Sequence, residues 1–141
     1  MTAFFDTNVP LDIIARRMPF MDDSRTVVSM SGIGDVKGVA TDMTFCTIAY
    51  IMRKSLRGEQ LRGVLQTLHK YISIVPVNDN VMTEAIDSFV GDFEDEVQYR
   101  AALAAGADVI ITRNKEDFAN SSIPVMTPTE FLDKTNHDGM S

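Results

Sequence analysis

Carboxylate and amide side chains follow apolar segments at three places in this sequence. The three groups are Asp6 after residues 3–5, Asp92 with Asp95, and Asn114 with Asp117 after residues 109–112. Carboxylates that meet in one place repel each other unless a cation neutralises them. Among divalent cations, Mg²⁺ and Mn²⁺ suit a site built only from oxygen ligands. The sequence therefore predicts a Mg²⁺ or Mn²⁺ site wherever the fold brings these groups together.

The expected fold brings them to one edge of a sheet. Strands are predicted at residues 3–5, 38–41, 72–77, 109–112 and 123–126, because short apolar runs flanked by helical patterns are typical of buried parallel strands. Alternating strands and helices indicate a three-layer α/β/α domain with a central, mostly parallel sheet. Ligands bind beyond the carboxyl ends of such strands. Asp6, Asn114 and Asp117 should converge there, and a helix that begins at Asp92 can join them.

The remaining patterns predict where the helices begin and end. Helices are expected at residues 10–15, 22–33, 44–54, 59–71, 78–89, 92–105 and from 128 onward. The expected N-terminal caps are the segment 22–24, Asn78, and Thr127 paired with Glu130. The length of 141 residues fits one domain at 1–135, followed by a flexible tail at 136–141. Cys46, the one cysteine, excludes an internal disulfide and is expected in the core.

The charge distribution bears on the choice of partner. A net charge of −7 argues against nucleic acid, since phosphate binding requires Lys and Arg. Seven acids nevertheless gather between positions 79 and 96, where bound cations would offset them. A basic sector lies elsewhere, at Arg53, Lys54, Arg57, Arg62 and Lys70. The sequence contains no apolar run near 18 residues and no secretory leader pattern, which predicts a cytoplasmic protein without membrane contact.

Each acidic motif also has a purely structural interpretation. Asp6 can shape the turn that follows the first strand. Asp92 and Asp95 can cap a helix and complement its dipole. Asn114 and Asp117 can belong to an Asx-turn with solvated charges. Asp12, further along the first helix, is expected to face solvent.

A family resemblance favours the functional interpretation. The opening segment FDTNVPLD, residues 5–12, resembles the start of PIN domains. Residues 92–99 (DFEDEVQY) and 106–118 (GADVIITRNKEDF) strongly resemble the second half of a PIN subgroup with DFxD and TRNxxDF motifs. The resemblance covers nearly the whole chain in order and spacing. It implies a three-layer α/β fold and, as in many PIN domains, metal-dependent endoribonuclease activity, including that of the VapC-like toxins of VapBC-type toxin–antitoxin pairs.

The resemblance also implies residue roles. Asp6 and Asp95 match acidic metal positions of the family, and Asn114 and Asp117 match the final part of its site. Asp92 belongs to the subgroup pattern but ranks below Asp95 as a metal ligand. Thr47 stands where the family commonly has a glutamate, so the predicted site has one charge fewer and its metal binding should be weaker.

The resulting hypothesis is a Mg²⁺- or Mn²⁺-dependent ribonuclease that cleaves by in-line attack, leaving a 5′-phosphate and a 3′-hydroxyl. The predicted metal ligands are Asp6, Asp95 and Asp117; the further catalytic residues are Asn114 and Thr47; the predicted RNA contacts are Asn8, Arg113 and Lys115. An antitoxin protein and a second copy of the chain are the expected protein partners.

Two other functions stay open at the level of sequence. The first is a degenerate, non-catalytic PIN domain that binds RNA or a protein partner, which the Thr47 substitution favours. The second is a phosphatase or phosphotransferase with Asp6 as covalent nucleophile. That chemistry requires a second acid two residues later, where this chain has Asn8.

Overall fold

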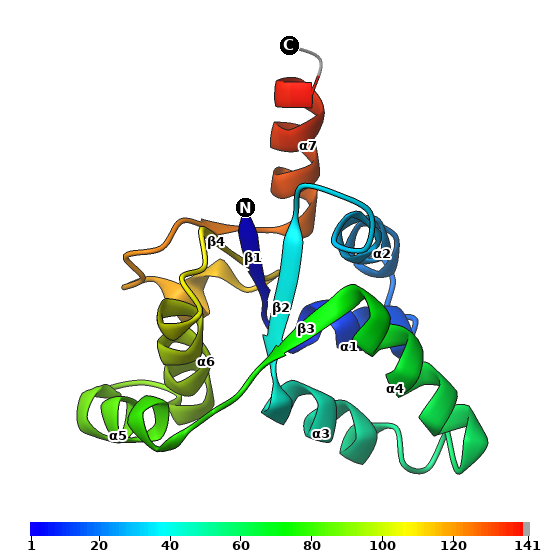
Figure 1. The fold of residues 1–141 in the computed structure, drawn as a ribbon, viewed down its shortest axis with the longest axis horizontal. Coiled ribbons are helices and arrows are strands. Elements are labelled where there is room, and N and C mark those ends of the chain that lie inside the picture. The colour runs from blue at the N-terminus through cyan, green and yellow to red at the C-terminus, as the bar shows by residue number, and fades with distance from the viewer. Residues whose placement is uncertain (140–141) are drawn as a thin grey trace.

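A sheet of five parallel strands forms the centre of the protein, whose computed structural model describes residues 1–139 (Figure 1). The strand order is β3-β2-β1-β4-β5. The strands are β1 (Thr2–Phe5), β2 (Lys37–Thr41), β3 (Ile72–Val75), β4 (Val109–Ile111) and β5 (Val125–Met126). All five predicted strands are therefore present. Because β1 is central, its carboxyl end lies between those of β2 and β4.

Helices cover both faces of this sheet, which confirms the predicted three-layer α/β fold (Figure 1). The helices are α1 (Asn8–Ile14), α2 (Met21–Met30), α3 (Asp42–Ile51), α4 (Glu59–Tyr71), α5 (Asp79–Ser88), α6 (Phe93–Ala104) and α7 (Pro128–Gly139), with a 3₁₀ turn η1 (Lys115–Phe118). One apolar cluster joins the sheet to α1, α2, α4 and α7, and a second joins it to α5 and α6. The active-site candidates thus lie at the end of a sheet that is packed on both sides.

The alternation of side chains along β1 explains these two clusters. Ala3 and Phe5 belong to the first cluster and Phe4 to the second, as expected from the period of two in a strand. All three are 0% exposed. Gly38 on β2 faces Phe5 closely, because a Cβ at this position would lie 2.6 Å from the Phe5 ring and 2.6 Å from Ser31 Cβ. A residue without a side chain is therefore required there.

Two of the three predicted helix caps are present. Asn78 accepts a hydrogen bond from Val81 N at 2.9 Å. Thr127 and Glu130 form a reciprocal capping box, with distances of 2.9 and 3.1 Å. The predicted cap at 22–24 is wrong, because α2 begins at Met21 without a side-chain cap. Asp22 and Asp23 lie instead within its first turn, where the helix dipole favours acids.

Two other expectations also differ from the structure. Cys46 is exposed, not in the core. The reason is that α3 extends beyond the sheet and packs on one side only, so Ile48 is buried while Tyr50 and Ile51 are exposed. Helix α7 continues to Gly139, into the predicted tail at 136–141, whose last two residues lie outside the described part of the chain. The domain boundary and the flexibility of the tail stay predictions.

The helices of the structure can be compared with the length and hydropathy of a membrane-spanning helix. Within residues 1–139, no helix has the length and apolar character needed to cross a membrane.

Candidate active site

The pairing of β1 with β4 places Asp6 and Thr112 next to each other. Phe5 and Ile111 are paired residues at the carboxyl ends of these two parallel strands. Asp6 N then donates to Ile111 O at 3.0 Å, which continues the ladder one step beyond β1. The side chains that follow the two strands therefore emerge at the same edge of the sheet, as the sequence predicted.

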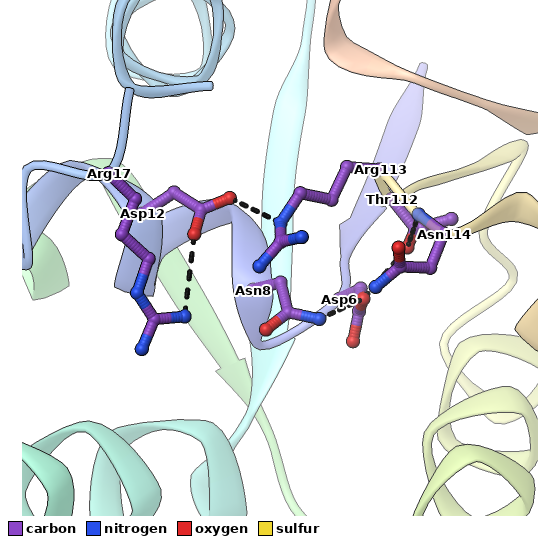
Figure 2. Close-up of polar contacts among 7 residues, drawn as sticks. All are labelled: Asp6, Asn8, Asp12, Arg17, Thr112, Arg113 and Asn114. Carbon is purple, nitrogen blue, oxygen red and sulfur yellow. Dashed lines mark hydrogen bonds and ion pairs between the residues drawn. The ribbon is translucent and has the colours of Figure 1, made fainter. Parts of the chain in front are cut away.

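Neutral groups surround the carboxylate of Asp6, which is only 3% exposed. Gln98 Nε2 donates to Oδ1 at 3.0 Å, and Thr112 Oγ1 donates to Oδ2 at 2.8 Å. Asn8 Nδ2 makes a longer contact with Oδ2, at 3.4 Å. Figure 2 shows Asn8, Thr112 and Asn114 around this carboxylate. Donors without charge hold Asp6 in place while leaving its negative charge available to a cation.

Gln98 is a site residue that the sequence analysis missed. It is 2% exposed, and its Oε1 accepts from Thr7 N at 3.1 Å, which fixes the amide so that Nε2 faces Asp6. The Thr7 hydroxyl in turn bonds the Thr44 hydroxyl at 2.8 Å. One signal in the sequence indicated Gln98: it follows Asp95 by three residues, so both lie on one face of α6.

Carboxylates from α6 and η1 repel one another beside Asp6. Desolvation, together with the charges of Asp117, Asp92, Asp6 and Glu94 in that order, raises the pKa of Asp95 to about 7. Desolvation also raises the pKa of Asp117, with smaller contributions from Glu116, Asp6 and Asp92. The pKa of Glu94 rises for the same reason, first through desolvation and then through Asp92 and Asp6. Asp6 contributes to the raised pKa of both Asp95 and Asp117, so the three carboxylates lie close enough to interact.

Asp92 has the structural role that its motif suggested. Its Oδ1 accepts from Asp95 N at 3.0 Å, so it is the N-terminal cap of α6. It also borders a hollow of about 690 Å³ between α6 and η1, together with Asp95, Glu116 and Asp117.

The donor set fits a hard divalent cation. The groups beside Asp6 are carboxylates, and their excess negative charge is what a cation would neutralise. Within residues 1–139, no three His, Cys, Asp or Glu side chains lie close enough together to share one ion. Mg²⁺ does not require such a cage, because one or two carboxylates, water and substrate phosphate complete its shell.

The other predicted residues lie at different distances from this centre. Asn114 is half-buried, and its backbone N–H donates to Thr112 Oγ1 at 3.1 Å, which keeps it next to Asp6 (Figure 2). Lys115 is turned toward α7, where Nζ pairs with Glu130 at 3.1 Å. Thr47 is half-buried on α3, and no hydrogen bond in the described structure joins its side chain to Asp6. The structure thus groups Asn114 with Asp6 but does not group Lys115 with it.

The expectation that Asp12 faces solvent is wrong. Asp12 is 0% exposed, and its Oδ2 accepts from Arg113 Nε at 2.8 Å. Arg17 Nη1 lies 3.6 Å from the other carboxylate oxygen (Figure 2). Burial raises the pKa of Asp12, and the two arginines offset part of that rise. Two cations therefore make it possible to bury this acid, and the sequence does not show that they lie nearby.

Comparison with known proteins identifies the architecture. Residues 2–116 match the family model described as PIN domain. Similar solved structures include a toxin–antitoxin complex from Klebsiella pneumoniae, with 20% identity, coverage of 89% of this chain and 97% of that chain, and a TM-score of 0.68. VapBC-1 from nontypeable Haemophilus influenzae has 18% identity, coverage of 92% and 99%, and a TM-score of 0.68. VapBC2 from Rickettsia felis, bound to a DNA fragment from its promoter, has 16% identity, coverage of 89% and 97%, and a TM-score of 0.65.

At these identities the solved structures show a shared fold, and the family follows from the domain match. A comparison with curated proteins found no significant match. The domain match covers most of the chain, including β1 with Asp6, all of α6, and the loop after β4 up to Glu116. This chain therefore belongs to the PIN-domain family.

Proposed function

We propose that this protein is a metal-dependent endoribonuclease and the toxin of a toxin–antitoxin pair. One observation supports the nuclease assignment above the others: carboxylates from three separate segments lie close enough to interact beside the carboxyl end of β1. Desolvation, together with the charges of these neighbouring carboxylates, raises the pKa of Asp95 to about 7. Such an arrangement is costly for a folded protein unless it serves to bind a cation.

The proposed cofactor is Mg²⁺ or Mn²⁺, held by Asp6 and Asp95, with Asp117 completing its shell directly or through water. When bound, such an ion lowers the pKa of a coordinated water and neutralises charge on phosphate oxygens. The protein's own contribution is orientation. Gln98 and Thr112 fix the two oxygens of Asp6, and Asn114 lies next to them through its bond to Thr112.

The proposed RNA contacts lie around the same edge. Asn8 is adjacent to Asp6, and Arg113 is partly exposed next to Thr112. Lys115 contributes only if RNA displaces it from Glu130, so we expect Lys115 to contribute less to RNA binding than Arg113. The overall negative charge is consistent with a substrate that binds after a cation has neutralised the cluster.

The proposed partners follow from relatives. The solved structures from Klebsiella pneumoniae and Haemophilus influenzae are a toxin–antitoxin complex and VapBC-1, respectively, and this supports an antitoxin protein as partner. A homodimer and a cytoplasmic location stay predictions from the sequence.

A degenerate PIN domain is the second candidate, and Thr47 favours it. A threonine on α3 supplies no negative charge where the family commonly has glutamate, so metal affinity and cleavage can both be lost while binding surfaces remain. The covalent phosphatase has no comparable support, since Lys115, its candidate lysine, pairs with Glu130 away from Asp6.

Cleavage of RNA tests the proposal. A panel of structured and single-stranded RNAs is incubated with metal-free protein, with Mg²⁺ and with Mn²⁺. We expect cleavage only with metal, products that carry 5′-phosphate, and loss of activity in Asp6→Asn. The matched control is Asp35→Asn, which removes the same charge from an exposed loop before β2, at the opposite end of the sheet. Folded protein that cleaves no RNA would support the degenerate alternative, and equal activity in Asp6→Asn would exclude this site.

A further inference from the structure

The buried ion pair between Asp12 and Arg113 links helix α1 to the loop of the active site. The two residues are 101 positions apart in the sequence, and the bond from Nε to Oδ2 measures 2.8 Å. The Asp12 side chain is 1% exposed and that of Arg113 is 25% exposed. A buried acid and a partly exposed base therefore meet one residue away from Thr112, which holds Asp6.

Two contacts of its side chain and the hydrogen bonds of its two neighbours fix Arg113. Its Nε donates to Asp12, and its guanidinium carbon lies 4.4 Å from the centre of the Phe20 ring. Its backbone lies between Thr112, which donates to Asp6, and Asn114, whose N–H donates to the Thr112 hydroxyl. These contacts leave the side chain little freedom to change direction.

The terminal nitrogens of Arg113 are free to bind a ligand. In the described structure neither Nη atom donates a hydrogen bond to protein. The two Nη atoms are also accessible. In the described part of the chain, Asp12 Oδ1 is the only buried side-chain polar atom that lacks a hydrogen-bond partner, so the unpaired Nη atoms are not buried. Figure 2 shows the guanidinium extending from the loop after β4 to the α1 side of Asp6. Two parallel N–H groups of arginine match two oxygens of a phosphate, which gives bidentate binding.

We infer that Asp12 is a positioning residue that orients Arg113, so that the two Nη groups bind a phosphate of the RNA strand beside Asp6. The inference rests on the proposed function, because the phosphate is that of the proposed substrate. Asp12 does not contact RNA; it occupies Nε and thereby turns the Nη groups outward. Lysine cannot replace arginine here, since it has one nitrogen and lacks the planar fork in which Nε pairs with Asp12 while two parallel N–H groups face a phosphate.

RNA binding by variants tests this inference. A fluorescein-labelled single-stranded RNA is titrated with protein, and anisotropy is followed with Ca²⁺ in place of Mg²⁺. The variants are Arg113→Lys, Arg113→Gln, Asp12→Asn and the double variant Asp12→Asn/Arg113→Lys. Lys37→Gln is the charge-matched control, because Lys37 is exposed at the amino end of β2. Thermal unfolding shows which variants are folded, and cleavage with Mg²⁺ or Mn²⁺ is measured in parallel.

The expected result is an increase in Kd of about tenfold for Arg113→Lys and for Arg113→Gln, the effect of losing one charge-assisted hydrogen bond. Asp12→Asn should weaken binding by a similar factor, and the double variant should be no more than about twofold weaker than either single variant, since both changes disrupt one interaction. Lys37→Gln should bind like the wild type.

Other outcomes overturn the inference. A folded Asp12→Asn that binds RNA like the wild type shows that the pair only anchors the loop. If the increase in Kd of the double variant equals the product of the two single increases, Asp12 and Arg113 act separately. If Asp12→Asn does not fold, then wild-type binding by Arg113→Lys is sufficient to refute the inference.

The parallel cleavage assay separates this inference from the proposed function. A protein that binds RNA through Arg113 without cleaving it refutes the nuclease and leaves the inference standing. A protein that cleaves RNA with the same KM in Arg113→Lys refutes the inference and leaves the nuclease standing. A wild type that neither binds nor cleaves RNA refutes both.

Discussion

Neutralising Asp95 should stabilise the metal-free protein at neutral and alkaline pH. The substitution is Asp95→Asn, which removes the charge from the group whose pKa rises to about 7 and keeps nearly the same shape. An acid with a raised pKa in the folded state binds more protons there than in the unfolded state. The free energy of unfolding of the metal-free wild type should therefore fall as pH rises from about 4 to about 7. The substitution should abolish this part of the pH dependence.

The magnitude follows from the rise in pKa and from an opposing effect. A rise from 3.8 to about 7 corresponds to about 4 kcal/mol, which solvent screening at this half-buried group reduces to about 2 kcal/mol. Asp95 also lies in the first turn of α6, where loss of an acid costs about 0.3–1 kcal/mol. The cost of the charge, from desolvation and repulsion together, is the larger effect, so Asp95→Asn should be more stable by about 1–2 kcal/mol at pH about 8.

Urea denaturation with EDTA, at pH about 8 and about 4, measures this difference. The gain should nearly disappear at the lower pH, where Asp95 is protonated in the folded wild type. The control is Asp79→Asn, an exposed acid in the first turn of α5, which should show only the dipole loss. If Asp95→Asn is destabilised as much as Asp79→Asn at the higher pH, the charge of Asp95 does not destabilise the folded protein.

Added Mn²⁺ should stabilise the wild type more than Asp95→Asn, since only the wild type has all the proposed ligands.

Three further predictions concern the site and the core. Thr47→Glu should lower the Kd for Mn²⁺ by about tenfold in calorimetry, since one more carboxylate adds about 1.4 kcal/mol; an unchanged Kd would show that Thr47 does not face the ion. Thr112→Val should lower the free energy of unfolding by about 1–3 kcal/mol in urea, because it removes a donor from buried Asp6; a smaller loss than about 0.5 kcal/mol would contradict that hydrogen bond. Gly38→Ala should lower the free energy of unfolding by about 1–3 kcal/mol through overpacking against Phe5 and Ser31. Gly63→Ala, where a Cβ within α4 meets open space, should raise it by about 0.5–1 kcal/mol. Equal melting temperatures of the two variants would contradict the close packing around Gly38.

Local sequence signals were sufficient for most of the fold. The strand at residues 3–5 and the strand at 109–112 were predicted because apolar residues continue on both faces, as the two-sided packing of β1 and β4 requires. Helix α4 has the predicted bounds, 59–71. The capping box at Thr127 was readable because both partners lie within four residues. Each of these features depends on residues that are close together in the sequence.

Other features differ from or were missed by the sequence analysis because they depend on the rest of the fold. Asp12 appeared solvent-facing because its neutralising partner Arg113 is 101 residues away. Gln98 was missed because its amide is fixed by Thr7, 91 residues earlier. Cys46 appeared apolar enough for the core, but the direction of α3 leaves it exposed. The position of Asp6 at the carboxyl end of a strand could be predicted from the apolar run before it, whereas the groups that orient it could not.

Binding of Mn²⁺ to the metal-free protein tests the central claim most directly. Free Mn²⁺ is followed by electron paramagnetic resonance during titration of the wild type, Asp6→Asn and the exposed control Asp35→Asn. The account predicts saturable binding to the wild type and to Asp35→Asn at low millimolar concentration or below, and loss of that binding in Asp6→Asn. Absence of saturable binding to the folded wild type, or equal binding by Asp6→Asn, would contradict it.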